Sequence, residues 1–132
     1  MEDLRDRSSS RERALGLLYE AHAKGLGPLT VLDQIPVRPD PFACQLLAQV
    51  EEFGDQALTL ISDAAVGWTI ERMAVLDRLV LQLATCELLA GSEPPVAVVL
   101  DEAVELAKTF STDDSGRFVN GILSTIARQV RP

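Results

Sequence analysis

The chain has 132 residues, of which 47% are hydrophobic and only 5% aromatic, and its formal net charge is −8. This length is enough for one domain with a real core, and a core of Leu, Val, Ile and Ala favours packed helices over a sheet. The negative charge argues against nucleic-acid binding through a generally basic surface. With one histidine and no CxxC motif, the sequence offers almost no ligands for zinc, and it predicts no cofactor.

The sequence also bears on where the protein is found. It has no signal peptide and no apolar run of about 18 residues, so neither export nor a membrane span is expected. Cys44 and Cys86 lie far apart inside apolar helical patterns. Free, buried thiols in a reducing compartment are therefore expected rather than a disulfide, and the prediction is a cytoplasmic protein.

The N-terminal part of the chain predicts one long helix after a polar segment. Residues 1–8 are expected to be flexible. Ser9 and Glu12 then fit the spacing of a capping box, and the apolar pattern that follows runs to about Lys24. Gly25 provides the stop.

Three further segments follow before the middle of the chain. Residues 29–35 predict a short helix, and the prolines of residues 36–41 predict a connector. Residues 42–66 again show helical spacing, with Gly54 as a candidate kink.

The second half begins with a short turn over residues 69–73, for which Thr69 is a plausible cap, and then a strongly apolar helix over residues 75–90. The glycine and prolines of residues 91–95 break this helix, and another amphipathic helix leads to Phe110.

A second capping box opens the last predicted helix. Ser111 and Asp114 have the required spacing, and the helix is expected to end near Gln129. The whole pattern predicts six or seven helices and no strand, in a single all-α domain over residues 1–132.

The spacing of particular residues makes the chain resemble the NusB family of transcription antitermination factors. The matching motifs are Glu102-Ala-Val-Glu-Leu-Ala-Lys108 and Asp114-Ser-x-x-Phe-Val-Asn-Gly-x-Leu123 near the C-terminus, Arg11-Glu-x-Ala-Leu-x-x-Leu-Tyr19 near the N-terminus, and Gly67-Trp68 and Asp77-Arg-x-x-Leu between them. The two consecutive C-terminal motifs, at fixed spacing from each other, indicate a family far more specifically than helical periodicity does.

The resemblance implies a compact all-α fold of two small sub-bundles, here expected over residues 9–66 and 67–132. Members of the family pair with the small-subunit ribosomal protein NusE, and together they bind the boxA element of nascent RNA. With other Nus factors they act on elongating RNA polymerase, notably in ribosomal RNA operons. The resemblance therefore implies a non-enzymatic RNA-binding factor. A homodimer, and a divergent protein-interaction module that has lost RNA binding, stay open as alternatives.

The resemblance places part of the RNA surface on the first helix. Arg7 and Arg11 are four residues apart and share a face, whereas Arg13 points elsewhere. Tyr19 is suited to stacking on a base. The alternative is a solvated helix start whose charges pair with one another, because residues 1–25 hold five basic and five acidic side chains. In that alternative Tyr19 is simply half-buried at the edge of the helix.

The other implied RNA contacts are Asp114, Ser115, Arg117 and Phe118. Phosphate repels a carboxylate, so Asp114 would have to accept hydrogen bonds from base edges, while Arg117 could take a phosphate. The structural alternatives are a helix N-terminal acid for Asp114 and a core residue for Phe118.

Asp77 and Arg78 lie on the helix that the family presents to its ribosomal-protein partner. An acidic patch there would suit a basic protein, which could supply much of the attraction for RNA.

Two further features have structural interpretations. Glu87 and Glu102 lie among apolar residues, but no nucleophile, base or phosphate-binding loop accompanies them. We therefore expect no catalytic role for these carboxylates, and we expect Lys108 or helix termini to be their hydrogen-bonding partners. A NusB-like domain also precedes the catalytic domain of an rRNA cytosine methyltransferase, for which this chain is expected to have no room.

Asn120 and Gly121 are unfavourable inside a helix, and close packing at Gly121 is the preferred explanation.

Overall fold

The computed structural model describes the backbone of residues 4–132 and the side chains of residues 7–132. These residues form six α-helices and one 3-10 turn, with no strand among them, which confirms the predicted all-α fold. In chain order the elements are α1 (Leu4–Lys24), α2 (Pro28–Gln34), α3 (Pro41–Ala64), η1 (Ile70–Arg72), α4 (Val75–Ala90), α5 (Val96–Phe110) and α6 (Ser115–Val130).

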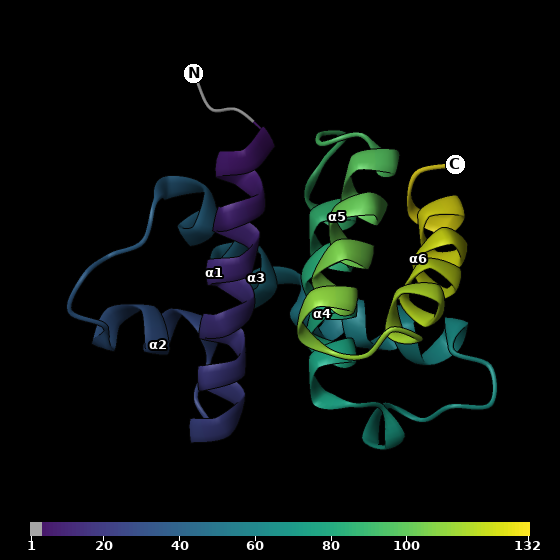
Figure 1. Cartoon of the computed structure of the whole chain (residues 1–132), viewed down its shortest axis with the longest axis horizontal. Helices are drawn as coiled ribbons and strands as arrows, with labels where there is room; N and C mark the ends of the chain where they lie inside the picture. The colour runs from purple at the N-terminus through teal and green to yellow at the C-terminus, as the bar shows by residue number, and fades with distance from the viewer. Residues whose placement is uncertain (1–3) are drawn as a thin grey trace.

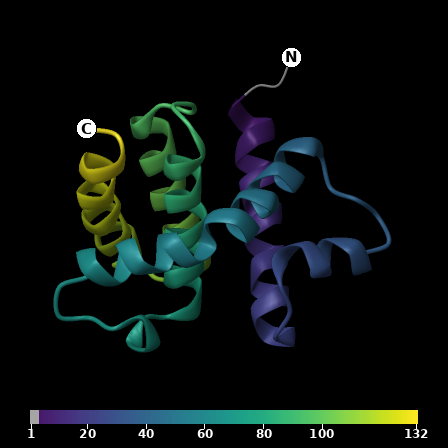
Figure 2. The ribbon, with the colours of Figure 1, turned by 180° about the vertical axis from the view of Figure 1, so that it is seen from behind.

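Helix α3 connects the two ends of the molecule. It packs against α1 and α2 on one side and against α4 and α6 on the other. Figures 1 and 2 show α1 and α2 at one end, α5 and α6 at the other, and α3 running between them. The aliphatic side chains that the helical spacing selects form one continuous core, with Leu46, Leu47, Ile61, Leu81 and Leu123 fully buried.

Asp40 begins helix α3 and ties it to α1. Its Oδ2 accepts hydrogen bonds from the backbone N–H groups of Phe42 and Ala43, at 3.1 and 3.2 Å, and from the Ser10 hydroxyl at 2.6 Å. Burial by itself raises the pKa of Asp40, but the hydrogen bonds from Ser10, Ala43 and Phe42 outweigh it and lower that pKa below its usual value of 3.8.

Both capping-box predictions are wrong. Helix α1 already includes residues 4–8, so Ser9 lies inside it and does not begin it. Residues 1–8 were expected to be flexible; of these, only residues 1–3 lie outside the described chain. Helix α6 begins at Ser115, and the side chain of its N-cap, Asp114, makes no capping hydrogen bond. The Ser111 hydroxyl instead accepts from the Ser115 hydroxyl at 3.1 Å.

Arg131 closes the C-terminal end of α4. Its guanidinium donates to the backbone carbonyls of Leu88 and Glu87, at 3.1 and 3.0 Å, and to those of Ser92 and Pro94. Carbonyls in the last turn of a helix have no partner within the helix. Arg131 therefore satisfies them and fixes the end of α6 against α4.

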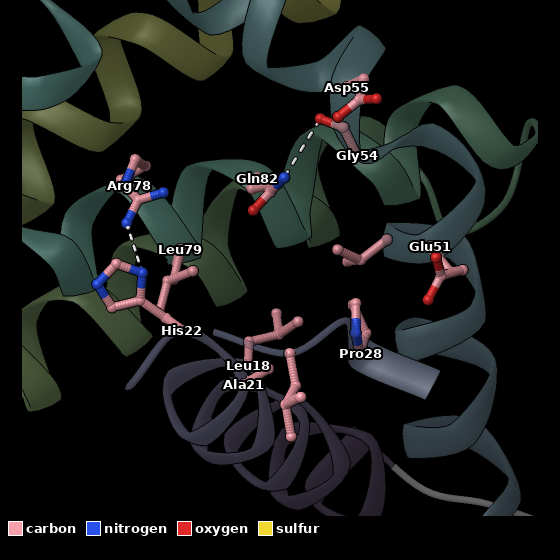
Figure 3. A pocket seen from close by; sticks show the side chains of 12 residues that line it. Leu18, Ala21, His22, Pro28, Glu51, Gly54, Asp55, Arg78, Leu79 and Gln82 are labelled. Carbon is pink, nitrogen blue, oxygen red and sulfur yellow. Dashed lines mark hydrogen bonds between the residues drawn. The ribbon is translucent and has the colours of Figure 1, made fainter. Parts of the chain in front are cut away.

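The close approaches between helices occur at Gly54 and Gly116 rather than at Gly121. Helix α3 passes through Gly54 without interruption, and Gln82 Nε2 donates to the Gly54 carbonyl at 3.2 Å (Figure 3). A Cβ on Gly116 would lie 3.0 Å from Lys108 Cγ, whereas one on Gly121 would meet nothing within 4 Å. The prediction that Gly121 is closely packed is therefore wrong.

We expect Asp40→Ala to lower the free energy of unfolding at pH 7 by about 1 kcal/mol, because it removes an N-cap. Since the pKa of Asp40 is lower in the folded chain, its contribution is present above the unfolded pKa and is lost as the pH falls through the folded pKa. Urea unfolding of both proteins from pH 7 down to pH 2.5 would measure this. Asp101→Ala, at an exposed position, is the control. A difference that persists undiminished at the lowest pH would contradict the assignment.

Gly121→Ala should raise the free energy of unfolding by about 0.5–1 kcal/mol, because alanine is the better helix former and the site is open. Gly116→Ala should gain less or lose stability, since Lys108 and Val104 would have to move. Thermal unfolding of the two variants gives the comparison, and the reverse order would show that the packing around these glycines is misassigned.

Candidate nucleic-acid and partner interface

Arg11 forms a buried ion pair between α1 and α4. Its Nε and Nη2 donate to the two carboxylate oxygens of Glu87, at 3.0 and 2.8 Å, and the two residues are only 2% and 3% exposed. The prediction that Arg11 contacts RNA is therefore wrong, because its charge is paired and out of reach. The expectation that Lys108 or helix termini satisfy Glu87 is also wrong, because Arg11 is its partner.

Arg7 shares the inward face of α1 with Arg11. Their guanidinium carbons lie 4.6 and 5.1 Å from the centre of the Phe42 ring, so both groups stack on this side chain of α3. The predicted common face is confirmed, but it faces the protein. Arg13 is exposed and points elsewhere, as predicted.

The outward face of α1 carries Tyr19. Residues 12, 16 and 19 share this face by helical spacing, and the Tyr19 side chain is 49% exposed. One turn before it, a Cβ on Gly16 would meet nothing within 4 Å. Tyr19 thus stands beside an open stretch of helix and is accessible to a stacking ligand.

The groove between α1 and α5 is acidic. Ser8 donates to Glu102 Oε1 at 2.7 Å, and Glu12 and Glu105 also line the groove. Glu102 is therefore satisfied by a hydroxyl of α1 rather than by Lys108, and this groove is unsuited to phosphate.

The other residues predicted to contact RNA lie at the turn between α5 and α6, and they differ in how accessible they are. Ser115 is only 3% exposed, and its hydroxyl accepts from the Thr112 N–H at 3.2 Å, so the prediction that it contacts RNA is wrong. Asp114 and Arg117 are exposed. Phe118 is half-buried, with its ring edge-on to Trp68 at a centroid distance of 5.9 Å.

Asp114 and Phe118 line a pocket of about 400 Å³ together with Asp77. We call it the aromatic pocket; its other main walls are Trp68, Arg72 and Met73. Residues expected to contact RNA and a residue expected to contact the protein partner therefore meet in one place. In the sequence, Trp68 stands out only as part of a family motif.

Arg78 faces a different pocket from its neighbour Asp77, because adjacent helical residues are about 100° apart. Arg78 Nη2 lies 3.1 Å from His22 Nδ1, at the edge of a pocket of about 290 Å³ between α1, α3 and α4 (Figure 3). Glu51 and Asp55 of α3 line its other side. The two residues predicted to form one partner surface are thus divided between two pockets.

Neither a metal site nor a membrane segment emerges from the part of the chain that the structure describes. No group of three or more His, Cys, Asp or Glu side chains is placed to hold a metal ion within residues 7–132. No helix of the described chain is long and apolar enough to cross a membrane.

Both cysteines are free. Burial, followed by the charge of Glu87, raises the pKa of the Cys86 thiol to about 12.

Comparison with known proteins gives consistent matches along the chain. Residues 8–128 match the model of the NusB family. The transcription antitermination protein NusB of Streptomyces avermitilis is 44% identical over 135 residues, which cover 96% of this chain and 93% of that protein. The corresponding protein of Acidothermus cellulolyticus is 41% identical over 124 residues, covering 91% and 86%.

Solved structures agree with this match. The structure of T. maritima NusB superimposes with a TM-score of 0.86 at 32% identity, covering all of this chain and 96% of that one. A chain from a structure described as a plectonemic RNA supercoil gives a TM-score of 0.81 at 25% identity, with 96% of both chains covered.

Arg11→Ala should lower the free energy of unfolding by about 3–5 kcal/mol, because it leaves the Glu87 carboxylate buried without a partner. The double variant Arg11→Met, Glu87→Met should recover most of this loss, since neither charge then remains. Arg13→Ala serves as the exposed control and should stay within about 0.5 kcal/mol of the parent protein. If Arg11→Ala unfolds at the parent urea concentration, the ion pair does not have the assigned role.

Proposed function

This chain belongs to the NusB family, and on that premise we propose that it is a transcription antitermination factor that binds boxA-type nascent RNA together with the ribosomal protein NusE. The complex then couples this RNA to elongating RNA polymerase with other Nus factors, notably in ribosomal RNA operons. The protein works in the cytoplasm without catalysis and without a cofactor. The family match over residues 8–128 is the observation that carries this proposal.

The accessible residues that best suit RNA lie on two separate parts of the molecule, the outward face of α1 and the start of α6. Tyr19 offers a ring on which a base can stack. Arg13 and Arg117 are exposed cations for phosphates, and Asp114 can accept from the amino group of cytosine or guanine. Arg7 contributes less than its position suggests, because its guanidinium stacks on Phe42.

Two exposed arginines support only modest affinity, because each phosphate contact adds a small, salt-dependent increment. With a net charge of −8, the chain alone attracts RNA poorly at a distance. A basic ribosomal protein bound to it would supply the missing attraction. The proposal therefore assigns RNA binding to the complex rather than to this chain alone.

Tyr19→Ala should weaken binding of labelled boxA RNA to the complex with NusE at least fivefold, because stacking on one base is worth about 1–3 kcal/mol. Fluorescence anisotropy at fixed salt measures the dissociation constant. Val37→Ala is a suitable control, since Val37 is an exposed hydrophobic residue far from this face in sequence. An unchanged dissociation constant for Tyr19→Ala would remove α1 from the RNA surface.

The second candidate function is a protein-interaction module that no longer binds RNA, either with another protein or as a homodimer. The burial of Arg11 and the stacking of the half-buried Arg7 on Phe42 favour it, because they engage two of the three α1 arginines that were expected to contact RNA (Arg7, Arg11 and Arg13). Titrating boxA RNA with and without NusE separates the two functions. No binding even with NusE present would favour the module, and light scattering at two concentrations would then reveal a homodimer.

A further inference from the structure

A groove of about 590 Å³ lies between the start of α5 and the end of α6, and we call it the C-terminal groove. Its main walls are Val96 and Leu100 of α5, Ser124, Ala127 and Arg128 of α6, and Arg131 just after α6. A volume of this size is in the range of known ligand pockets. Val96 and Leu100 are one helical turn apart and only half-buried, so they leave an apolar strip open to solvent beside two cations.

The charges of the C-terminal groove differ from those of the other grooves described above. Among the described residues that line it, none is an aspartate or a glutamate, and its charged side chains are Arg128 and Arg131. By contrast, two carboxylates line the aromatic pocket, two line the pocket beside Arg78, and three line the groove between α1 and α5. In a chain with a net charge of −8, the C-terminal groove is therefore a local region of positive potential.

Both arginines of the groove can still bind an anion. Four of the five N–H groups of Arg131 donate to backbone carbonyls at the end of α4 and in the loop after it, which leaves one Nη2 N–H without a partner among the described residues. Arg128 is exposed, and its Nη2 donates to the Thr125 hydroxyl at 3.3 Å. Carbonyls and hydroxyls do not neutralise a guanidinium, and neither arginine forms an ion pair with a carboxylate of the described residues.

We propose that the C-terminal groove binds an acidic segment of a protein partner. An apolar side chain of this segment would pack on Val96 and Leu100, and a neighbouring carboxylate would meet Arg128, with Arg131 as a fixed second cation. The two arginines repel a basic segment, so this surface does not serve the basic partner of the proposed function. The inference goes beyond that function, because it gives the chain a second protein partner of opposite charge.

The groove is separated along α4 from Asp77, which is expected to contact the basic partner. Arg131 bonds to the carbonyl of Leu88 near the end of α4, whereas Asp77 lies in its first turn. The two α4 positions are eleven residues apart, or about 16 Å along the helix axis. In Figure 1 the start of α5 and the end of α6 lie at the top of these two helices, and the turn that joins them lies at the bottom. Both partners can therefore bind at once.

A nucleotide fits the C-terminal groove less well than an acidic protein segment. No aromatic side chain is among the described residues that line it, so a base would have no ring on which to stack. The apolar strip instead suits an aliphatic side chain, whose burial is favourable in proportion to the apolar area removed from water. The groove thus combines the two features that an acidic, partly apolar protein segment requires.

Backbone amide signals of the full ¹⁵N-labelled chain can be followed during titration with the peptide acetyl-Asp-Leu-Leu-Asp-amide at fixed ionic strength. Acetyl-Asn-Leu-Leu-Asn-amide has a similar shape without the charge, and acetyl-Asp-Ser-Ser-Asp-amide keeps the charge without the apolar side chains. We expect saturable shifts at residues 96–100 and 124–131 with the acidic leucine peptide. Each of the other two peptides should bind at least fivefold more weakly, because it lacks one of the two contacts.

Arg128→Ala should weaken the acidic leucine peptide about fivefold and leave its asparagine counterpart nearly unchanged, because it removes a charge that only the first peptide uses. Leu100→Ala should weaken both peptides, since both contain the leucines. Arg38→Ala is the matched control: Arg38 is also exposed, but it lies in the connector between α2 and α3 and should leave the affinity unchanged. The remaining amide signals report whether each variant is folded.

The proposal is overturned by the absence of a saturable shift, by shifts confined to residues outside the groove, or by equal affinity for the acidic and asparagine peptides. Equal effects of Arg128→Ala and Arg38→Ala would also contradict it. Tighter binding of cytidine 5′-monophosphate than of the acidic leucine peptide would assign the groove to RNA instead. Neither boxA RNA nor NusE is present in these titrations, so their failure is distinguishable from a failure of RNA binding by the complex.

Discussion

The buried ion pair between Arg11 and Glu87 is the constraint on which the rest of the structure depends. It joins α1 to α4 in the interior, where a charge without its partner would be strongly destabilising. By fixing the rotation of α1, it directs Arg7 toward Phe42 and leaves Tyr19 on the outside. The backbone of Glu87 is held in turn by Arg131, so residues near both ends of the chain converge on one turn of α4.

Much of the helix pattern could be predicted from local sequence. The bounds of α4 were predicted as residues 75–90, and the short helix α2 and the turn η1 lie where the sequence placed them. The capping predictions failed for two different reasons. Helix α1 begins at Leu4, before Ser9, and the Ser111 hydroxyl accepts from the Ser115 hydroxyl rather than from a helix N–H. Local spacing does not distinguish these choices.

The candidate site was less predictable, because it depends on contacts between residues far apart in sequence. Spacing showed that Arg7 and Arg11 share a face, but only Glu87, 76 residues further on, determines that this face is buried. A signal was available: a glutamate within the apolar helix α4 requires a cationic partner somewhere in the chain. Asp77 and Arg78 are adjacent in sequence yet line separate pockets, and the aromatic pocket requires Trp68, which no charge pattern selects.

Helix α1 therefore has two chemically different faces, an inner one that builds the fold and an outer one that we propose binds RNA. Hydroxyl-radical footprinting of the complex with NusE, with and without boxA RNA, tests this division most directly. RNA should protect Tyr19 and the side chains near Arg117, and it should leave the reactivity around Phe42 unchanged. Protection confined to the Phe42 side of α1, with Tyr19 as reactive as before, would contradict the assignment.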